Sequence, residues 1–339
     1  MFILLLSLFV VGAVCDKTDG GKAPRLPLND GRSIPHIGLG TFLGFDEGGE
    51  IKSKNAEVEN AVSWSLQAGY RLIDTASAYG TEDQVGKAVR ESGIPREDIF
   101  VLTKLGYKEK RDVVGSLRNS LKRLGLDYVD LYLIHNPISF KADSSIDNID
   151  YVDTWKQMEE AKKLGLAKSI GISNFNVTQI ERLLKHSQIK PAVLQVEVNL
   201  NLAQNRLIEL CKSEDIIIMA YTPFGSLFSS DTEPPPPRAN DPTLNALAQK
   251  YKKTVPQIVL RYLVQRGVVP IPKSIKKERI EQNIDIFDFK LTSEEMETLS
   301  KFNKDYRVVF PTFWQDHPYY PFEKVDVAGP NPFKPNKKN

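Results

Sequence analysis

The chain has 339 residues, with 45 Lys and Arg against 43 Asp and Glu, and a formal net charge of +2. Hydrophobic residues make up 41% and charged residues 26%. These values exclude the low hydrophobicity and high net charge of disordered chains. The balanced charge also argues against nucleic-acid binding, because few uncompensated cations are present to neutralise phosphates. The length suits one large α/β barrel or two average domains.

The first fifteen residues differ from the rest of the chain. Residues 2–14 form an apolar run without a charged side chain, and a polar stretch follows Cys15 at once. The run is shorter than the roughly 20 residues that a membrane-spanning helix needs. Small Ala13 and Cys15 stand where a signal peptidase requires small residues. We therefore expect a signal peptide at 1–15, one domain at 16–339 and a secreted protein; a buried N-terminal strand is the alternative.

The cysteine content suggests an intracellular type of domain that carries an export signal. Removal of 1–15 would leave Cys211 as the only thiol, so the mature chain could form no internal disulfide. Asn176-Val177-Thr178 is a sequon for N-glycosylation, usable in the secretory pathway. Asn176 also suits the N-cap of a helix, and we favour the cap over the glycan.

Short apolar runs recur along the chain, as expected of strands that are buried on both faces of a parallel sheet. Eight such runs occur at 36–39, 71–73, 99–102, 129–134, 169–172, 193–198, 216–220 and 268–271. Helical patterns separate them. Eight strands alternating with helices over about 250 residues are typical of a TIM barrel. The predicted fold class is therefore an α/β (β/α)₈ barrel, with a doubly wound sheet as the alternative.

Two of the helices show clear apolar faces. The first presents Val58, Ala61, Val62, Ser65 and Leu66, and the second presents Val114, Leu117, Leu121 and Leu124. Gly69 and Gly125 follow as helix stops. Residues 26–35, with Asn-Asp-Gly at their centre, predict a β-hairpin ahead of the barrel.

Three segments interrupt the alternation, at 140–151, 228–241 and from about 305 to 339. The first is acidic, the second contains four consecutive prolines, and the third mixes aromatic residues with prolines. Long irregular loops tend to be functional, and in a barrel the loops after the strands form the mouth of the active site. The proline run could bind a proline-recognition module, but we favour a stiff loop.

Several common site motifs are missing from the sequence. The glycines of 38–44 have the wrong spacing for a dinucleotide-binding fingerprint, and there is no P-loop. Four histidines and two cysteines are scattered along the chain, so we expect no metal site. Tyr320 and Lys324 have the spacing of the short-chain dehydrogenase pair, but Pro321 between them is incompatible with a helix.

Four ionisable residues follow predicted strands. Asp74 and Tyr79 come after the second strand, Lys104 after the third and His135 after the fourth. Each has an ordinary explanation alone, as a cap, a half-buried tyrosine, a surface lysine or a core histidine. Together they would stand at the C-terminal ends of successive barrel strands, where barrel enzymes have their active sites.

At these residues the sequence resembles the aldo-keto reductase family. The matching motifs are Ile73-Asp74-Thr75-Ala76 with Tyr79-Gly80, Thr103-Lys104, Ile134-His135, Gly171-Ile172-Ser173-Asn174-Phe175, and Ile271-Pro272-Lys273-Ser274 followed by Arg279 and Asn283. They occur in order, and the resemblance covers 26–321. It implies a (β/α)₈ barrel that reduces a carbonyl to an alcohol with NADPH.

The resemblance also implies a catalytic tetrad of Asp74, Tyr79, Lys104 and His135. Tyr79 would donate the proton to the developing alkoxide. Since a tyrosine with a pKa near 10 is a weak acid at neutral pH, we expect Lys104 to depress that pKa. Asp74 would keep Lys104 charged, and His135 would orient and polarise the carbonyl.

For NADPH, the resemblance implies several groups of contacts. Ser173, Asn174 and Gln195 would bind the carboxamide, and Tyr221 would stack on the nicotinamide. Residues 222–226 would lie along the pyrophosphate, and Lys273, Ser274 and Arg279 would bind the 2′-phosphate. The full set is Gly40, Thr41, Asp74, Ser173, Asn174, Gln195, Tyr221, Thr222, Pro223, Phe224, Gly225, Ser226, Lys273, Ser274, Arg279, Gln282 and Asn283. Gln282 stands where the family commonly has Glu.

The substrate pocket departs from the family pattern. Gly106, followed by Tyr107, and Asn136 occupy positions that often carry tryptophan, which predicts a wide pocket for a bulky ketone. Phe228 or Trp314 could refill the space. With its signal peptide and this pocket, the chain resembles the secreted insect 3-dehydroecdysone 3β-reductases, which act on an ecdysteroid ketone. We expect a monomer that acts on a small carbonyl compound; a non-catalytic NADPH-binding barrel with a structural role is the alternative.

Overall fold

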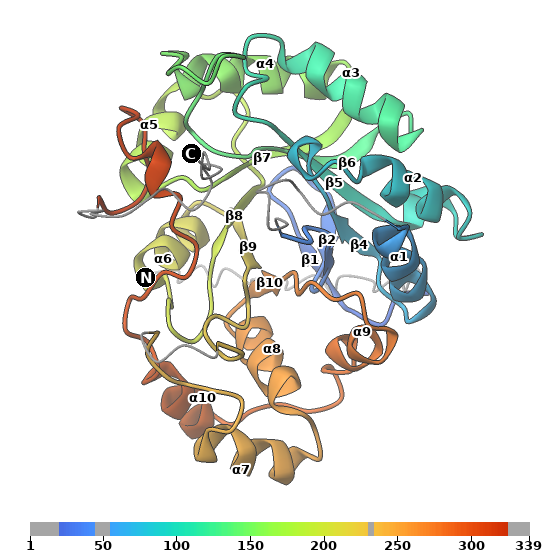
Figure 1. Cartoon of the computed structure of the whole chain (residues 1–339), viewed down its shortest axis with the longest axis vertical. Helices are drawn as coiled ribbons and strands as arrows, with labels where there is room; N and C mark the ends of the chain where they lie inside the picture. The colour runs from blue at the N-terminus through green and yellow to red at the C-terminus, as the bar shows by residue number, and fades with distance from the viewer. Residues whose placement is uncertain (1–19, 45–54, 230–233, 325–339) are drawn as a thin grey trace, which may run out of the picture.

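The structure is a computed structural model that describes residues 20–44, 55–229 and 234–324 (Figure 1). The expected signal peptide at 1–15 lies outside the described residues. Within those ranges, no helix is both long enough and apolar enough to span a membrane.

Eight parallel strands form the centre of the molecule. They are β3 (Leu39–Gly40), β4 (Leu72–Asp74), β5 (Phe100–Leu105), β6 (Val129–Ile134), β7 (Ala167–Ser173), β8 (Val193–Glu197), β9 (Ile217–Tyr221) and β10 (Val268–Pro270). Each pairs in parallel with its neighbour in sequence. The amides of Gly38 and Gly40 donate to the carbonyls of Pro270 (3.0 Å) and Pro272 (3.1 Å), which closes the barrel. The predicted (β/α)₈ fold is confirmed, and every predicted run overlaps a strand.

Helices surround the strands on the outside (Figure 1). They are α1 (Glu57–Gln67), α2 (Glu82–Arg90), α3 (Val113–Leu124), α4 (Tyr151–Lys163), α5 (Val177–His186), α6 (Asn205–Ser213), α7 (Pro242–Tyr251), α8 (Val255–Gln265), α9 (Lys277–Ile284) and α10 (Ser293–Ser300). The described residues also form short 3₁₀ helices, namely η1 (Ser77–Tyr79), η2 (Arg96–Asp98) and η3 (Thr312–Trp314). The predicted apolar face of α1 is buried at every position. In α3, Val113 lies four residues before Leu117 and takes the buried position, which leaves the predicted Val114 half-buried.

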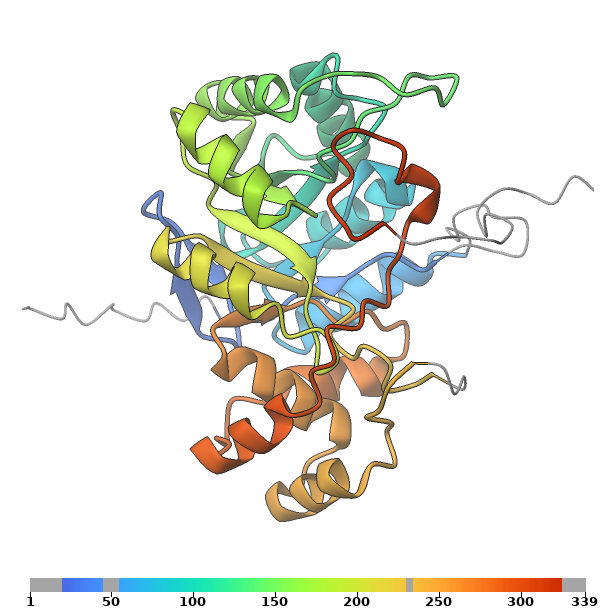
Figure 2. The same ribbon diagram turned by 90° about the vertical axis from the view of Figure 1, so that its left-hand side faces the viewer.

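The predicted hairpin closes one end of the barrel. Its strands are β1 (Arg25–Pro27) and β2 (Ser33–Pro35), and its side chains Leu28 and Ile34 pack into the apolar barrel interior. The Asp30 carboxylate in the turn accepts hydrogen bonds from Lys162 Nζ and Ser169 Oγ, both at 2.8 Å. In Figure 2 the hairpin and the C-terminal segment that carries η3 lie at opposite ends. The C-terminal ends of the strands therefore form the open mouth.

Candidate active site

The structure brings the four predicted catalytic residues together. Asp74 ends β4, Lys104 lies near the end of β5, His135 directly follows β6, and Tyr79 ends η1. Since β4, β5 and β6 are adjacent parallel strands, their C-terminal ends deliver these side chains to one place. The fold, rather than proximity in sequence, thus assembles the cluster.

Lys104 is at the centre of this cluster. Its Nζ donates to both carboxylate oxygens of Asp74 at 2.8 Å, to the Thr75 carbonyl at 3.0 Å and to Tyr79 Oη at 3.2 Å. The Tyr79 ring meets the His135 ring edge-on, with 5.7 Å between centroids. The Lys104 side chain is fully buried and that of Asp74 almost so. A buried ammonium thus connects a carboxylate to a phenol at the mouth of the barrel.

The charge distribution corrects one expectation. Burial, and secondarily the Asp74 carboxylate, raise the pKa of Tyr79 well above its usual value, so the expected depression by Lys104 is not found. The causes are the loss of water on burial and, second, the negative charge of Asp74. Burial lowers the pKa of Lys104, while the charge and hydrogen bonds of Asp74 oppose that lowering. Tyr79 is therefore a neutral phenol at physiological pH.

His135 is also neutral in this environment. Burial is the main cause that lowers its pKa to about 3, and the positive charges of Lys104 and Lys110 lower it further. The Asn174 side-chain amide donates to the backbone carbonyl of His135 at 2.9 Å. The imidazole can therefore hydrogen-bond a ligand oxygen without carrying a charge.

The predicted carboxamide-binding residues form a network across the strand ends. Gln195 Nε2, on β8, donates to Asp74 Oδ2 at 2.7 Å. Tyr221 Oη, at the end of β9, donates to Asn174 Oδ1 at 2.8 Å, and Asn174 Nδ2 also donates to Ser173 Oγ at 3.3 Å. At the other side of the cluster, Thr41 Oγ1 donates to the Asp74 backbone carbonyl at 2.8 Å. Thr41 follows Gly40, and both were predicted to contact the cofactor.

The remaining predicted cofactor residues lie further out on the same rim. Thr222, Pro223, Phe224, Gly225 and Ser226 form the loop after β9; Lys273 and Ser274 follow β10; Arg279, Gln282 and Asn283 lie on α9. Lys273 and Arg279 are exposed, and neither has an ion-pair partner within the described part of the chain. Two uncompensated cations near the start of one helix suit a phosphate group.

Aromatic side chains from three segments form a wall beside the cluster. Tyr107 follows β5, Phe140 lies in the loop after β6, and Trp314 belongs to η3. The Tyr107 ring centroid is 5.1 Å from that of Trp314 and 5.8 Å from that of Phe140. Phe228 does not join this wall, because it is 62% exposed and contacts Phe224 instead.

The structure corrects the interpretation of Gly106. A Cβ at this position would lie 2.7 Å from Glu109 Oε2, so the Glu109 carboxylate occupies the space next to the Gly106 backbone. The same oxygen accepts from the Gly106 amide and from Ser77 Oγ, both at 2.7 Å. The expectation of a wider pocket therefore depends on Asn136, whose side chain is buried beside His135.

Comparison with known proteins assigns the chain to a family. Residues 36–304 match the model of the aldo/keto reductase family. The chain is 53% identical over 307 residues to aldo-keto reductase AKR2E4 of Bombyx mori, a match that covers 88% of this chain and 99% of that protein. It is 41% identical over 322 residues to human aldo-keto reductase family 1 member C4, with 89% and 98% covered. The chain belongs to the aldo/keto reductase family.

Solved structures of aldo-keto reductases agree with this assignment. The crystal structure of Bombyx mori AKR2E4 in complex with NADP matches with a TM-score of 0.83 at 52% identity, covering 88% of this chain and 99% of that one. A structure of AKR2E5 complexed with NADPH matches with a TM-score of 0.87 at 42% identity, covering 92% and 97%. This aldo-keto reductase is accordingly an NADPH-dependent oxidoreductase that reduces carbonyl compounds.

The residues of this aldo-keto reductase fit NADPH. The charges of Lys273 and Arg279 lack a protein partner in the described ranges, as a site for the 2′-phosphate requires. Amide and hydroxyl groups line the strand ends where a carboxamide would bind, and the Tyr221 ring remains half-buried there. The donor set thus matches a molecule with a phosphate at one end and an amide at the other.

Several buried polar residues of this reductase were not predicted from the sequence. Glu197, Asn199 and Asn201 follow Gln195 at alternate positions, and Lys110 lies beside His135. The signal for the first three was present, since a charged residue two positions after Gln195 points to the same face of β8. Only the structure shows what they contact.

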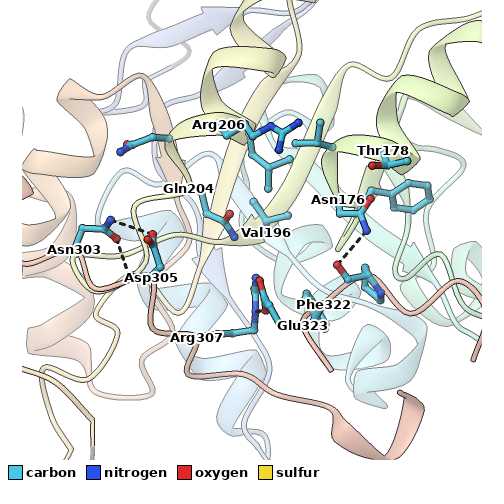
Figure 3. A pocket seen from close by; sticks show the side chains of 15 residues that line it. Asn176, Thr178, Val196, Gln204, Arg206, Asn303, Asp305, Arg307, Phe322 and Glu323 are labelled. Carbon is cyan, nitrogen blue, oxygen red and sulfur yellow. Dashed lines mark hydrogen bonds and ion pairs between the residues drawn. The ribbon is translucent and has the colours of Figure 1, made fainter. Parts of the chain in front are cut away.

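A separate cavity of about 500 Å³ lies beside the starts of α5 and α6 and the C-terminal segment (Figure 3). Its wall includes Val196, Arg206, Arg307 and Glu323, and Arg307 forms an ion pair with Glu323 at 3.2 Å. None of the predicted catalytic or cofactor residues lines it. The cavity is therefore distinct from the candidate active site.

Proposed function

We propose that Asp74, Tyr79, Lys104 and His135 form the catalytic tetrad of this NADPH-dependent carbonyl reductase. The observation that carries the proposal is the position of Lys104, whose Nζ contacts both the Asp74 carboxylate and Tyr79 Oη. The ion pair holds the ammonium next to the phenol. A proton donor beside a fixed positive charge is the arrangement that reduction of a carbonyl requires.

The tetrad residues have distinct roles in the proposed reaction. NADPH supplies the hydride that the carbonyl carbon accepts. The Tyr79 hydroxyl donates a hydrogen bond to the carbonyl oxygen and transfers its proton to the alkoxide as this forms. Its raised pKa keeps the proton in place until then, and the Lys104 ammonium stabilises the phenolate that remains. Neutral His135 donates a second hydrogen bond and orients the carbonyl.

For the cofactor, we propose the contacts implied by the family resemblance. Ser173, Asn174 and Gln195 bind the carboxamide, Tyr221 stacks on the nicotinamide, and Lys273 and Arg279 bind the 2′-phosphate. Their place around one rim, from β7 to α9, supports this proposal. The loop 222–226 between them is the segment that follows the pyrophosphate.

For the substrate, we propose a bulky, flat ketone such as a 3-dehydroecdysteroid. Two observations support this class. Asn136 replaces a large indole next to His135, and the Tyr107, Phe140 and Trp314 rings offer broad apolar faces for a fused-ring substrate. We further propose that residues 1–15 direct secretion of the chain, which N-terminal sequencing of protein from the culture medium would test.

The test of the proposed function is NADPH consumption with carbonyls from small aldehydes to steroid ketones. The wild type should prefer the bulky ketones. Tyr79→Phe should lose at least about 100-fold in kcat, since it removes the proton donor while keeping the ring. Asn136→Trp should lower turnover of bulky ketones and spare that of small aldehydes.

Two results would contradict this assignment. Equal loss for all carbonyls in Asn136→Trp would remove the argument for a wide pocket. Binding of NADPH without turnover of any carbonyl in the wild type would favour a non-catalytic barrel instead.

A further inference from the structure

Three buried polar side chains form a ladder at the end of β8. Glu197, Asn199 and Asn201 occupy alternate positions, and their exposed fractions are 0%, 0% and 1%. We call them the Glu–Asn–Asn ladder. Buried polar groups of this kind are costly unless hydrogen-bonded, so their partners indicate what the ladder holds.

The first member holds the C-terminal segment. Glu197 Oε1 accepts from the Val308 amide at 2.8 Å and from Asn199 Nδ2 at 3.0 Å, and Oε2 accepts from the Val309 amide at 2.9 Å. All three partners are donors, and an ionised carboxylate only accepts. Glu197 therefore holds the C-terminal segment by the amides of residues 308–309, and Val309 lies five residues before Trp314.

The last member holds two loops at once. Asn201 Oδ1 accepts from the amide of Ser226 at 3.2 Å and from its Oγ at 2.9 Å. Its Nδ2 donates to carbonyl oxygens of the proline run 234–237 at 2.8 and 3.1 Å. Its own carbonyl accepts from the amides of Lys304 and Tyr306 at 3.0 and 3.1 Å. Asn201 thus contacts both the loop after β9 and the C-terminal segment.

The middle member completes the connection. Asn199 Nδ2 donates to Glu197 and, at 3.2 Å, to the Thr222 carbonyl. A Cβ on Gly225 would lie 2.7 Å from Asn201 Oδ1 and 2.8 Å from Asn199 Oδ1, and Gly225 has φ +51°. Glycine is therefore required where the loop after β9 packs on the ladder.

We propose that the Glu–Asn–Asn ladder couples NADPH binding to the position of the C-terminal segment that carries Trp314. The inference rests on the proposed contact of residues 222–226 with the cofactor. When NADPH orders this loop, it also orders Ser226, which is hydrogen-bonded to Asn201. Asn201 in turn binds the amides of Lys304 and Tyr306 in the C-terminal segment. A second connection runs from the loop through Asn199 to Glu197, which binds residues 308–309. The ladder residues position the substrate wall and do not contact the reacting atoms.

Hydrogen exchange of the Val308 and Val309 amides tests the coupling directly, with NADPH as the added ligand. In the wild type, NADPH should slow their exchange by about tenfold. Asn201→Ala should abolish that slowing and raise the Kd of NADPH by about tenfold. Asn245→Ala is the matched control, because Asn245, on α7, donates to the carbonyl oxygens of Ala239 and Asp241 and to no ladder residue.

Steady-state kinetics test the anchor of the C-terminal segment. In Glu197→Gln, the new side-chain NH₂ group faces backbone amides that are themselves donors, so a hydrogen bond to the C-terminal segment is lost. This variant should raise the KM of the carbonyl about tenfold and leave kcat within about twofold. Glu197→Asp, which keeps the charge, should recover part of the loss. An equal fall of kcat in both variants would overturn the positioning role.

Persistent NADPH-dependent slowing at Val308 and Val309 in Asn201→Ala would also overturn the proposal. If Asn201→Ala does not fold, Gly225→Ala disturbs the same junction from the loop side and should give the same loss of slowing. If NADPH slows exchange at Val308 and Val309 in a wild type that reduces no carbonyl, the result would support the role of the ladder and refute the proposed catalytic function. The failures of the two proposals are therefore distinguishable.

Discussion

At the scale of single residues, the site depends on one buried ion pair. Lys104 and Asp74 are withdrawn from water, and each removes much of the cost of burying the other. The hydrogen bond from Gln195 adds a further donor to Asp74. Lys104 therefore has a structural role in addition to its proposed role beside Tyr79.

Removing Lys104 should show both roles. Lys104→Met leaves the Asp74 carboxylate buried without its cation and should lower the free energy of unfolding by about 3 kcal/mol. It should also lower kcat strongly, because the phenolate of Tyr79 loses its stabilising charge. Urea unfolding and NADPH consumption measure the two effects.

The double variant Lys104→Met with Asp74→Asn is the control. It removes both charges and should regain much of the lost stability while staying inactive. A single variant as stable as the wild type would show that the pair contributes little to folding.

At the scale of elements, the mouth of the barrel is built from loops held together by polar contacts. His317 Nδ1 accepts from the Tyr319 amide at 3.0 Å, and its Nε2 lies 3.1 Å from the Ser139 carbonyl, which links the C-terminal segment to the loop after β6. At α5, Asn176 Oδ1 accepts from the Gln179 amide, and the side chain of Gln179 bonds back to the Asn176 amide. The predicted N-cap at Asn176 is confirmed as a full capping box.

This cap leads to a prediction about the sequon. Asn176→Ala removes the cap and the bond from Nδ2 to the Pro321 carbonyl, and should cost about 1 kcal/mol of unfolding free energy. Thr178→Ala destroys the sequon but keeps the cap, and should change stability by less than about 0.5 kcal/mol. Urea unfolding of protein expressed through a secretory pathway separates the cases. Equal losses in both variants would indicate that a glycan, rather than the cap, contributes the stability.

At the scale of the whole molecule, the two ends of the barrel have different tasks. The β1–β2 hairpin closes the end where the strands begin (Figure 2). The predicted catalytic residues lie at the other end, where the strands finish. The closed barrel also withdraws histidines from water. Burial, followed by the charge of Arg261, lowers the pKa of His36 to about 4, and burial lowers that of His135 to about 3.

These histidines predict how stability depends on pH. Below pH 6.5 the unfolded chain binds protons that the folded chain excludes, so the free energy of unfolding should fall as the pH decreases towards 5. For each such histidine the slope should rise from about 0.7 kcal/mol per pH unit at pH 6.5 to about 1.4 at lower pH. Urea unfolding at pH 7.5, 6.5 and 5.5 measures this slope. His36→Gln should reduce it by the contribution of one histidine. A slope that does not change in this variant would contradict the prediction.

The sequence by itself determined the barrel and predicted the residues of the candidate site. The signals that predicted these features are local. They are apolar runs of strand length, the helical spacing of apolar residues in α1 and the glycines after the helices. Each reflects burial or backbone conformation that a residue and its near neighbours decide. Asp74, Tyr79, Lys104 and His135 could be named because parallel strands bring their C-terminal ends to one rim. The resemblance to aldo-keto reductases then supplied their roles.

Only the tertiary structure decided how these residues act on one another. The raised pKa of Tyr79 follows from burial beside Asp74, the space at Gly106 is taken by Glu109, and Phe228 turns away from the wall. The Glu–Asn–Asn ladder joins segments that lie about a hundred residues apart. Electrostatics and packing at close range depend on such long-range neighbours, and spacing along the chain carries no information about them.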